Sequence, residues 1–400
     1  MQKKKVAIVG TTGLPAKYGG FETLAHYLTA NLNEKFDFTV YCSTKYFDSK
    51  GKRKTTFNGS QLVYLPLNAN GYQSILYDII SIVHALFYAD VILILGVSGS
   101  IILPVIKLFS SKKIIINIDG QEWRRQKWNV FTQQFLKFSE MVAVKYADTV
   151  ITDNAVIKEQ VLENYKTDSV LITYGGDHVS KKELNVDACI KYPFIKEKDY
   201  AFTVCRIEPE NNIQLILEAY SNMPNKKLVI VGLWNHGRFG MQLREEYSVY
   251  QHIHLLDPIY DQDELNIIRS NAAVYIHGHS AGGTNPSLVE AMCLGLPIMA
   301  FAVAYNKETT MHQALYFNNA AELQQLVKTT SSQKLASVRI KMLELGITQY
   351  SWIHIARSYS NQIEWLTDLS TQELLEELRE GSGEGVKLYT TKEQHSSIKK

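Results

Sequence analysis

Short apolar runs, many rich in valine and isoleucine, recur along this chain with helical patterns between them. In the first half they span residues 5–10, 37–42, 61–65, 90–96, 113–119, 148–153 and 169–174. Uninterrupted runs of this kind are typical of parallel strands that are covered by helices on both faces. After the first run, Phe21, Leu24, Ala25, Leu28 and Leu32 fall on one helical face. The alternation predicts a doubly wound parallel sheet.

The pattern breaks once and then restarts, which indicates two domains. Residues 181–198 are polar and highly charged, and we expect them to form the interdomain linker. Further strand-like runs follow at 200–206, 227–232, 252–257, 272–277, 297–303 and 314–317. We predict an N-terminal domain at 1–185 and a C-terminal domain at 186–350, because 400 residues exceed one ordinary α/β core. A helical segment at 351–380 is expected to pack back toward the first domain, and 381–400 to be a disordered tail.

Cysteine usage and hydropathy indicate a cytoplasmic protein. The four cysteines are scattered without a CxxC pair, which fits a reducing compartment and argues against a zinc site. The uncharged stretch 91–106 is shorter than the roughly 20 residues that span a bilayer. The net charge of +2 combines a basic first half with an acidic second half. The basic half either faces an anionic partner or is an ordinary lysine-rich surface.

A glycine-rich loop joins the first predicted strand to the first helix. It contains Gly10, Gly13, Gly19 and Gly20, and glycines at such a junction let backbone N–H groups approach a phosphate closely. The loop is longer than the dinucleotide-binding fingerprint and contains a proline, so a dehydrogenase is disfavoured. A purely structural loop remains an alternative. Glu22, in the first helical turn, either faces the site or complements the helix dipole from the surface.

A second polar cluster follows the strand at 113–119. Asp119, Glu122, Trp123 and Arg124 bring together carboxylates, a cation and an aromatic face. Ligands of open α/β sheets bind beyond the carboxyl ends of strands, and tryptophan faces suit sugar rings. The alternative is a capped helix start with an ordinary charged surface.

The second half holds two matching features. Arg206 ends the strand at 200–206, where it could grip a diphosphate and stabilise a departing charge, or pair with Glu208 or Glu210. After the strand at 272–277, residues 282–285 offer several backbone donors just before Pro286 and a helix. Glu290 lies about one turn inside that helix, within reach of a ribose.

No metal site is expected. Asp261 and Asp263 form a DxD sequence, but they directly precede a helix and are better explained as its cap and first turn. His277 and His279 have no further clustered ligands.

Taken together, these motifs resemble the family 4 glycosyltransferases of the GT-B fold. The closest resemblance is to the bacterial, β-1,4-rhamnosyltransferase-like group with a DUF1972-type N-terminal domain, and it covers about residues 1–365. The segments that carry it are 10–15 with 18–22, 119–128, 174–178, 206–212 and 277–292. The resemblance implies two Rossmann-like domains that face a central cleft.

The resemblance also implies site residues, without any metal or cofactor. Arg206, Glu22 and Asp119 take the catalytic roles. The donor-binding residues are Gly19, Gly20, Arg206, Asn211, Gly283, Thr284, Asn285, Ser287, Glu290 and Glu308. The acceptor-binding residues are Glu22, Asp119, Glu122, Trp123, Arg124 and His178.

Three positions depart from the family pattern. Gly282 stands where the first glutamate of an E-x7-E motif is expected, and Asn211 stands where relatives have a phosphate-binding lysine. Ala304 and Tyr305 replace a glycine pair. A deoxysugar donor such as dTDP-rhamnose is consistent with these changes.

The implied activity is retaining transfer of L-rhamnose to a lipid-linked glycan acceptor in bacterial capsule, O-antigen or exopolysaccharide synthesis. The enzyme would sit at the inner face of the cytoplasmic membrane and bind no nucleic acid. Two alternatives remain open: a nucleotide-sugar epimerase or hydrolase, and a non-catalytic nucleotide-sugar-binding subunit.

Overall fold

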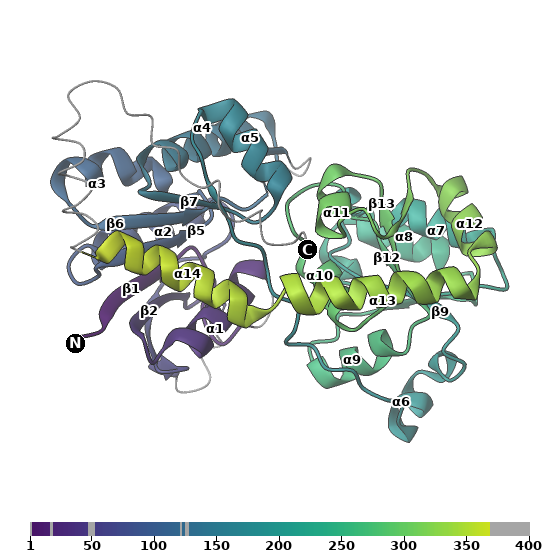
Figure 1. The fold of residues 1–400 in the computed structure, drawn as a ribbon. Helices are drawn as coiled ribbons and strands as arrows, with labels where there is room; N and C mark the ends of the chain where they lie inside the picture. Colours follow the sequence, from purple (N-terminus) through teal and green to yellow (C-terminus); the bar gives the residue numbers. More distant parts are fainter. Residues whose placement is uncertain (1, 17–18, 47–52, 121, 125–127, 369–400) are drawn as a thin grey trace, which may run out of the picture.

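The computed structural model describes residues 2–16, 19–46, 53–120, 122–124 and 128–368, which form two α/β domains (Figure 1). The predicted tail at 381–400 and the end of the predicted helix beyond 368 lie outside these residues. Within the described residues, the first sheet has eight strands in the order β3-β4-β2-β1-β5-β6-β7-β8. They are β1 (Lys4–Val9), β2 (Phe36–Ser43), β3 (Thr56–Phe57), β4 (Ser60–Leu65), β5 (Val91–Leu95), β6 (Lys113–Asn117), β7 (Thr149–Thr152) and β8 (Val170–Leu171).

The second sheet has six strands in the described part of the chain, in the order β11-β10-β9-β12-β13-β14. They are β9 (Tyr200–Val204), β10 (Lys227–Val231), β11 (Ile253–Leu256), β12 (Val274–His277), β13 (Ile298–Phe301) and β14 (Leu315–Phe317). Each lies within a predicted run, and every strand of the first sheet except β3 overlaps one, with β1, β2 and β4 extending one residue beyond it at one or both ends. The sequence reading missed β3, a two-residue strand that pairs antiparallel with β4. Asn58 and Gly59 connect the two strands with φ of 47° and 72°, the backbone of a tight hairpin turn.

Helices cover both faces of the first sheet. One face packs against α1 (Gly20–Leu32) and α14 (Trp352–Thr367). The other face is covered by α2 (Gln73–Ala85), α3 (Leu103–Phe109), α4 (Val130–Tyr146) and α5 (Ala155–Tyr165). Short 3-10 turns lie at Ser100–Ile102 and Glu122–Arg124. The buried faces of β1, β5 and β6 are almost wholly aliphatic, as the Val/Ile runs predict.

The second sheet is covered in the same way. One face packs against α6 (Val186–Lys191), α9 (Gln262–Ser270), α10 (Pro286–Cys293) and α13 (Ser332–Gln349). The other carries α7 (Ile213–Ser221), α8 (Arg238–Tyr247) and α12 (Ala320–Thr329), and α11 (Ala304–Thr309) follows β13. Further 3-10 turns lie at Pro193–Ile195, Pro209–Asn211 and Trp234–His236.

The stretch 181–198 is not simply a linker, which corrects the sequence interpretation. It contains α6, and Ala188, Tyr192 and Ile195 are buried in the core of the second domain. Its high charge hid the pattern, because only one side of this short helix faces the core.

The chain crosses between the domains twice, at neighbouring points. Figure 1 shows α13 lying along the second domain and α14 continuing onto the first. At the crossing, Gly176 N–H donates to the carbonyl of Tyr350 (2.8 Å), and Trp352 N–H donates to Asp177 Oδ1 (2.9 Å). Gly175 leaves room for the Trp352 ring, since a Cβ there would lie only 2.5 Å from it. None of the helices in the described part of the chain is both long and apolar enough to cross a membrane.

Candidate active site

Each sheet has one point where the strand order reverses, and the conspicuous loops lie there. In the first sheet β1 is flanked by β2 and β5, and in the second β9 is flanked by β10 and β12. The crevice beyond such a point is the usual ligand site of an open α/β sheet. Gly10 follows β1, Arg206 lies just beyond β9, and Gly278 follows β12. Gly10 has φ of 91°, and a Cβ there would overlap the carbonyl of Leu95.

The two sets of loops meet across the domain boundary. A Cβ on Gly120 would overlap the backbone of Gly282 and Gly283. A Cβ on Gly20 would lie 3.6 Å from the ring of Pro286 and 3.7 Å from that of Tyr174. The sequence-predicted loops of both domains therefore face one another at a single place.

Glu22 ties the front loop together from inside. Its Oε1 accepts hydrogen bonds from the backbone N–H (2.7 Å) and hydroxyl (2.9 Å) of Thr12, at the far end of the loop. The side chain is buried, so it is not a surface residue that complements the helix dipole. Burial raises the pKa of the Glu22 carboxyl, against the lowering effect of the Thr12 bonds. Gly19, with φ of 124°, has no room for a Cβ beside this carboxylate.

The segment after β6 has a more structural role than the sequence suggests. Asp119 has φ of 57° and donates its N–H to Asn117 Oδ1 (3.1 Å). Trp123 donates its indole N–H to Glu140 Oε2 (3.1 Å) and packs against the first-domain core. Glu122 accepts from the indole N–H of Trp128 at 3.5 Å.

Cations, rather than an open face, flank the Trp123 ring. Arg124 and Lys137 each lie 5.0 Å from the ring centroid. A sugar that stacked where one of these cations lies would have to displace it. Residues 121 and 125–127 of the predicted cluster lie outside the described part of the chain.

Arg206, just beyond the end of β9, is more exposed than Glu290. Its side chain is 39% exposed, and its Nε lies 3.9 Å from Glu208 Oε2, a long ion pair. Asn211 instead faces inward: its amide donates to the carbonyl of Arg206 (2.7 Å), and its Oδ1 lies 2.6 Å from His279 Nδ1. The side chain of Asn211 therefore fixes the loop that carries Arg206.

The loop before α10 is held by its own side chains. Asn285 caps the helix, because its Oδ1 accepts from the N–H (3.1 Å) and hydroxyl (2.8 Å) of Ser287. The hydroxyl of Tyr275 donates to Ser287 Oγ at 3.0 Å. Thr284 N–H donates across the domain boundary to Asp153 Oδ2 at 3.1 Å. The sequence reading did not single out Asp153.

Glu290 lies in a buried charged network. Arg269 Nη1 donates to Glu290 Oε2, and His178 Nε2 lies 3.1 Å from Oε1. His178 Nδ1 accepts from the indole of Trp352 (3.0 Å), so the Nε2 carries the proton and donates to Glu290. Burial alone would raise the pKa of Glu290, but Arg269 and His178 outweigh it and hold it at about 2. The sequence reading also missed Arg269, whose partner is 21 positions away.

Ala304 and Tyr305, which stand where the family pattern has a glycine pair, begin helix α11 and make a packing contact. Tyr305 packs against the core of the first domain. The amide of Asn154, in the first domain, donates to the Tyr305 carbonyl and to Thr309 Oγ1, both at 3.3 Å. Glu308 lies on the same short helix and is half-buried. This helix is therefore an interdomain contact.

Within the described residues, no three His, Cys, Asp or Glu side chains cluster closely enough to hold a metal ion. Asp261 caps α9, with its Oδ1 accepting from Glu264 N–H at 2.9 Å, which confirms the cap interpretation of the DxD sequence.

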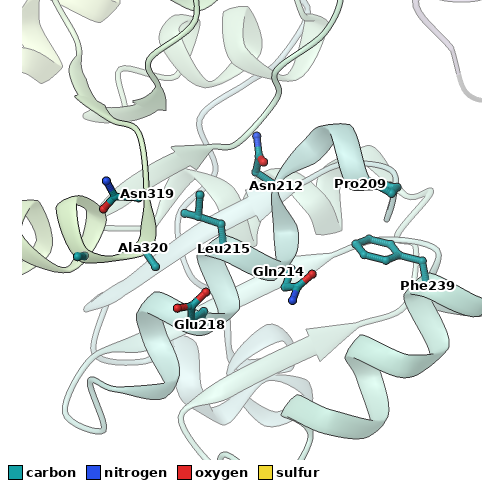
Figure 2. Close-up of a pocket in the computed structure, with 9 residues that line it drawn as sticks. Pro209, Asn212, Gln214, Leu215, Glu218, Phe239, Asn319 and Ala320 are labelled. Carbon is teal, nitrogen blue, oxygen red and sulfur yellow. The ribbon is translucent and has the colours of Figure 1, made fainter. Parts of the chain in front are cut away.

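Two open cavities lie on the second domain, and the first is bordered by Pro209 and Asn212 of the loop that follows Arg206. Figure 2 shows the first, about 550 Å³, between α7, Phe239 of α8 and the start of α12. Neither Arg206 nor any residue of 277–290 lines it, so it is not the candidate site. The second, about 360 Å³, lies beyond β11 and is lined by Tyr192, Ile259 and Glu264 among others.

Two family models match the chain, one over each domain. Residues 3–177 match the model of a domain of unknown function, DUF1972. Residues 190–359 match the model of the glycosyl transferases group 1 family. The second domain is therefore similar to group 1 glycosyltransferase domains. It contains Arg206, the 282–285 loop and Glu290.

One curated relative and several solved structures are similar. An uncharacterized glycosyltransferase of Methanocaldococcus jannaschii is 28% identical over 163 residues, which cover 39% of this chain and 41% of the relative. Sucrose-phosphate synthase from Thermosynechococcus elongatus has a TM-score of 0.73 at 15% identity, covering 95% of this chain and all of that one. HepE from Anabaena, solved with UDP-glucose, has a TM-score of 0.66 at 12% identity, covering 91% of this chain and all of that one. The fold is GT-B, as the sequence predicts.

Proposed function

We propose that the whole chain is a retaining glycosyltransferase that moves L-rhamnose from dTDP-rhamnose to a lipid-linked glycan acceptor, without a metal or cofactor. The main supporting observation is that the 282–285 loop meets the glycine loops of the first domain. This loop and Arg206 both follow strands at the switch point of the second sheet, in the part of the chain that matches a glycosyltransferase model. The second domain would bind the donor and the first the acceptor.

In the proposed reaction, the bond between the sugar C1 and the diphosphate oxygen breaks first. Negative charge then grows on the diphosphate, and Arg206 with the backbone donors before α10 stabilises it. The acceptor oxygen bonds to C1 from the same face, and its proton passes to the departing diphosphate. The protein contributes charge stabilisation and the orientation of two substrates.

A deoxysugar donor fits the environment of position 282. Gly282 has φ of 116°, a conformation that side chains rarely adopt, and a Cβ there would lie 3.0 Å from His279 Nε2. The backbone therefore favours glycine here for packing, and no carboxylate from this position reaches a sugar. A sugar with one hydroxyl fewer loses less from this absence than a glucose-like hexose.

The membrane contact that we propose lies on the side of the first domain covered by α2, α3 and α4. Four large apolar side chains on or beside these helices are strongly exposed: Phe87, Leu108, Phe109 and Phe131. Lys107 lies on α3 and Lys112 and Lys113 follow it, close in sequence to Leu108 and Phe109. Aromatic side chains flanked by lysines suit the interface of an anionic bilayer.

A transfer assay tests the proposed reaction. The full chain would be given dTDP-rhamnose, dTDP-glucose and UDP-glucose, each with and without a rhamnose-accepting lipid diphosphate, and the products analysed by mass spectrometry and NMR. We expect transfer only from dTDP-rhamnose, with the anomeric configuration of the donor retained. Donor consumption without acceptor would indicate the hydrolase or epimerase alternative, and binding without turnover the non-catalytic one.

Vesicle sedimentation tests the membrane contact. We expect the chain to sediment with vesicles containing an anionic lipid at low salt, and the Phe109→Ser variant to bind them more weakly. A Val249→Ser variant, altered at an exposed apolar residue of the second domain, is the matched control. Equal binding by all three proteins would contradict this surface.

A further inference from the structure

A carboxyl group of the first domain enters the loop that precedes α10 of the second. Asp153, directly after β7, is only 1% exposed. Its Oδ2 accepts from Thr284 N–H at 3.1 Å, and the Thr284 hydroxyl donates to the Asp153 carbonyl. Gly283 has no room for a Cβ, because it would overlap the Asp153 carboxyl. The contact thus joins the domains at the candidate site itself.

The groups that receive Asp153 are those suited to an anion. Thr284 lies two residues before Pro286, the first residue of α10, so its N–H belongs to the loop that leads into the helix start. The helix dipole adds partial positive charge there. A carboxylate and a phosphate oxygen present the same acceptor to these donors, so they cannot occupy one donor together.

The Asp153 carboxyl is imperfectly satisfied. Its Oδ1 is buried and accepts no hydrogen bond from any of the described residues. Burial, and then the neighbouring carboxylate of Asp119, raise its pKa well above the ordinary value. A buried carboxyl oxygen without a partner is costly, so this contact is weaker than its closeness suggests. A ligand anion with more oxygens can replace it.

The surrounding contacts hold Asp153 in place. Gly120 packs directly on the backbone of Gly282 and Gly283, and Asn154 next to Asp153 bonds to Tyr305 and Thr309 of α11. Because the adjoining backbone is fixed on both sides, the Asp153 side chain stays aimed at the loop while the domains touch.

We propose that Asp153 is an intramolecular competitor of the donor diphosphate for the backbone donors of the 282–285 loop. While the domains are in contact its carboxyl group occupies Thr284 N–H, and the diphosphate displaces it on binding. The inference rests on the proposed function of this loop as the donor site. If Asp153 competes with the donor, removing its carboxyl group strengthens donor binding. Removing a residue that binds the donor would weaken it.

Calorimetric titration with dTDP tests the inference on the full chain. Asp153→Ala and Asp153→Ser are both too short to reach Thr284, and each should bind dTDP at least about threefold more tightly than the unaltered chain. Asp168→Ala, at an exposed aspartate of the same domain, is the matched control and should bind as the unaltered chain does. Two variants are used because either alone could fold poorly.

The direction in which the dTDP affinity changes decides whether the inference holds. Tighter dTDP binding in both variants supports the competitor. Weaker binding in both overturns it and makes Asp153 a donor ligand, and unchanged binding overturns it as well. If neither the unaltered chain nor any variant binds dTDP or UDP, the proposed function itself fails. Binding by the unaltered chain without tightening in the variants refutes only the competitor.

Discussion

Arg269 is the buried cation on which the ionised Glu290 depends. It is 2% exposed, and its Nε donates to Asn266 Oδ1 at 2.8 Å while Nη1 reaches Glu290. Removing one partner of a buried ion pair strands the other, so Arg269→Met should lower the free energy of unfolding by about 3 to 5 kcal/mol. Urea denaturation measures this change.

A surface pair of the same domain provides the control for that prediction. Arg244 bonds to the exposed Asp257, and Arg244→Met should cost under about 1 kcal/mol. Adding Glu290→Gln to Arg269→Met should restore part of the loss, since no charge is then stranded. Equal losses for the two arginine substitutions would contradict the structural role of Arg269.

The burial of His277 leads us to expect that the stability of the protein depends on pH. His277 is fully buried at the end of β12, and burial lowers its pKa from 6.5 to about 3. The unfolded chain therefore takes up a proton below pH 6.5 that the folded chain does not. The stability that the neutral, buried His277 contributes is therefore fully present above pH 6.5. It is lost as the pH falls toward 3.

The size of the expected loss follows from the pH range between the unfolded and folded pKa values of His277. Between pH 7 and pH 5 the unaltered chain should lose about 2 kcal/mol more unfolding free energy than His277→Phe, which has no titrating group there. Urea denaturation at the two pH values compares them. The same loss in both proteins would show that His277 titrates normally.

The place of a residue in the site was predictable where the residue directly follows a predicted strand. Arg206 and the 282–285 loop follow strands, so the strand pattern placed them at the sheet edge. Asp153 and Arg269 act through partners 131 and 21 positions away, and no local pattern reveals such contacts. Glu22 was found, but its burial against Thr12 depends on how the loop folds back.

Helix α14 is the element that joins the end of the chain to the first domain. Trp352, at its start, is 3% exposed and stacks on Tyr27 of α1 with ring centroids 4.7 Å apart. Its indole also donates to His178. Trp352→Ala leaves a cavity and an unpaired imidazole, and should cost about 3 to 5 kcal/mol.

A second tryptophan on the same helix is the matched control. Trp365 is 49% exposed, and Trp365→Ala should change the melting temperature little. Thermal denaturation followed by circular dichroism compares both variants with the unaltered chain. A Trp352→Ala protein that melts with the unaltered chain would mean that α14 does not hold the first domain.

Elements were predictable where apolar runs are long. The strands of both sheets, apart from β3, coincide with predicted apolar runs to within one residue at each end or lie inside them, because both faces of each sheet are buried. The strand β3 is too short to show a pattern, and α6 buries only one side of a charged sequence. Tertiary packing, rather than local pattern, defines these two.

The whole molecule is organised around one interdomain contact. Glycine backbones, Asp153 and helix α11 bring the domains together at the 282–285 loop. Two of the three departures from the family pattern, Gly282 and Tyr305, lie in this contact. Tyr305 packs on the first-domain core, whereas the backbone of Gly282 and its closeness to His279 favour glycine at that position.

The most direct test of the account is the rate of sugar transfer after a change at Arg206. If Arg206 stabilises the departing diphosphate, Arg206→Ala should lower kcat/KM for dTDP-rhamnose by at least about 100-fold. Arg238→Ala, at an exposed arginine on α8, should transfer at the normal rate. Near-normal transfer by Arg206→Ala would contradict the central claim.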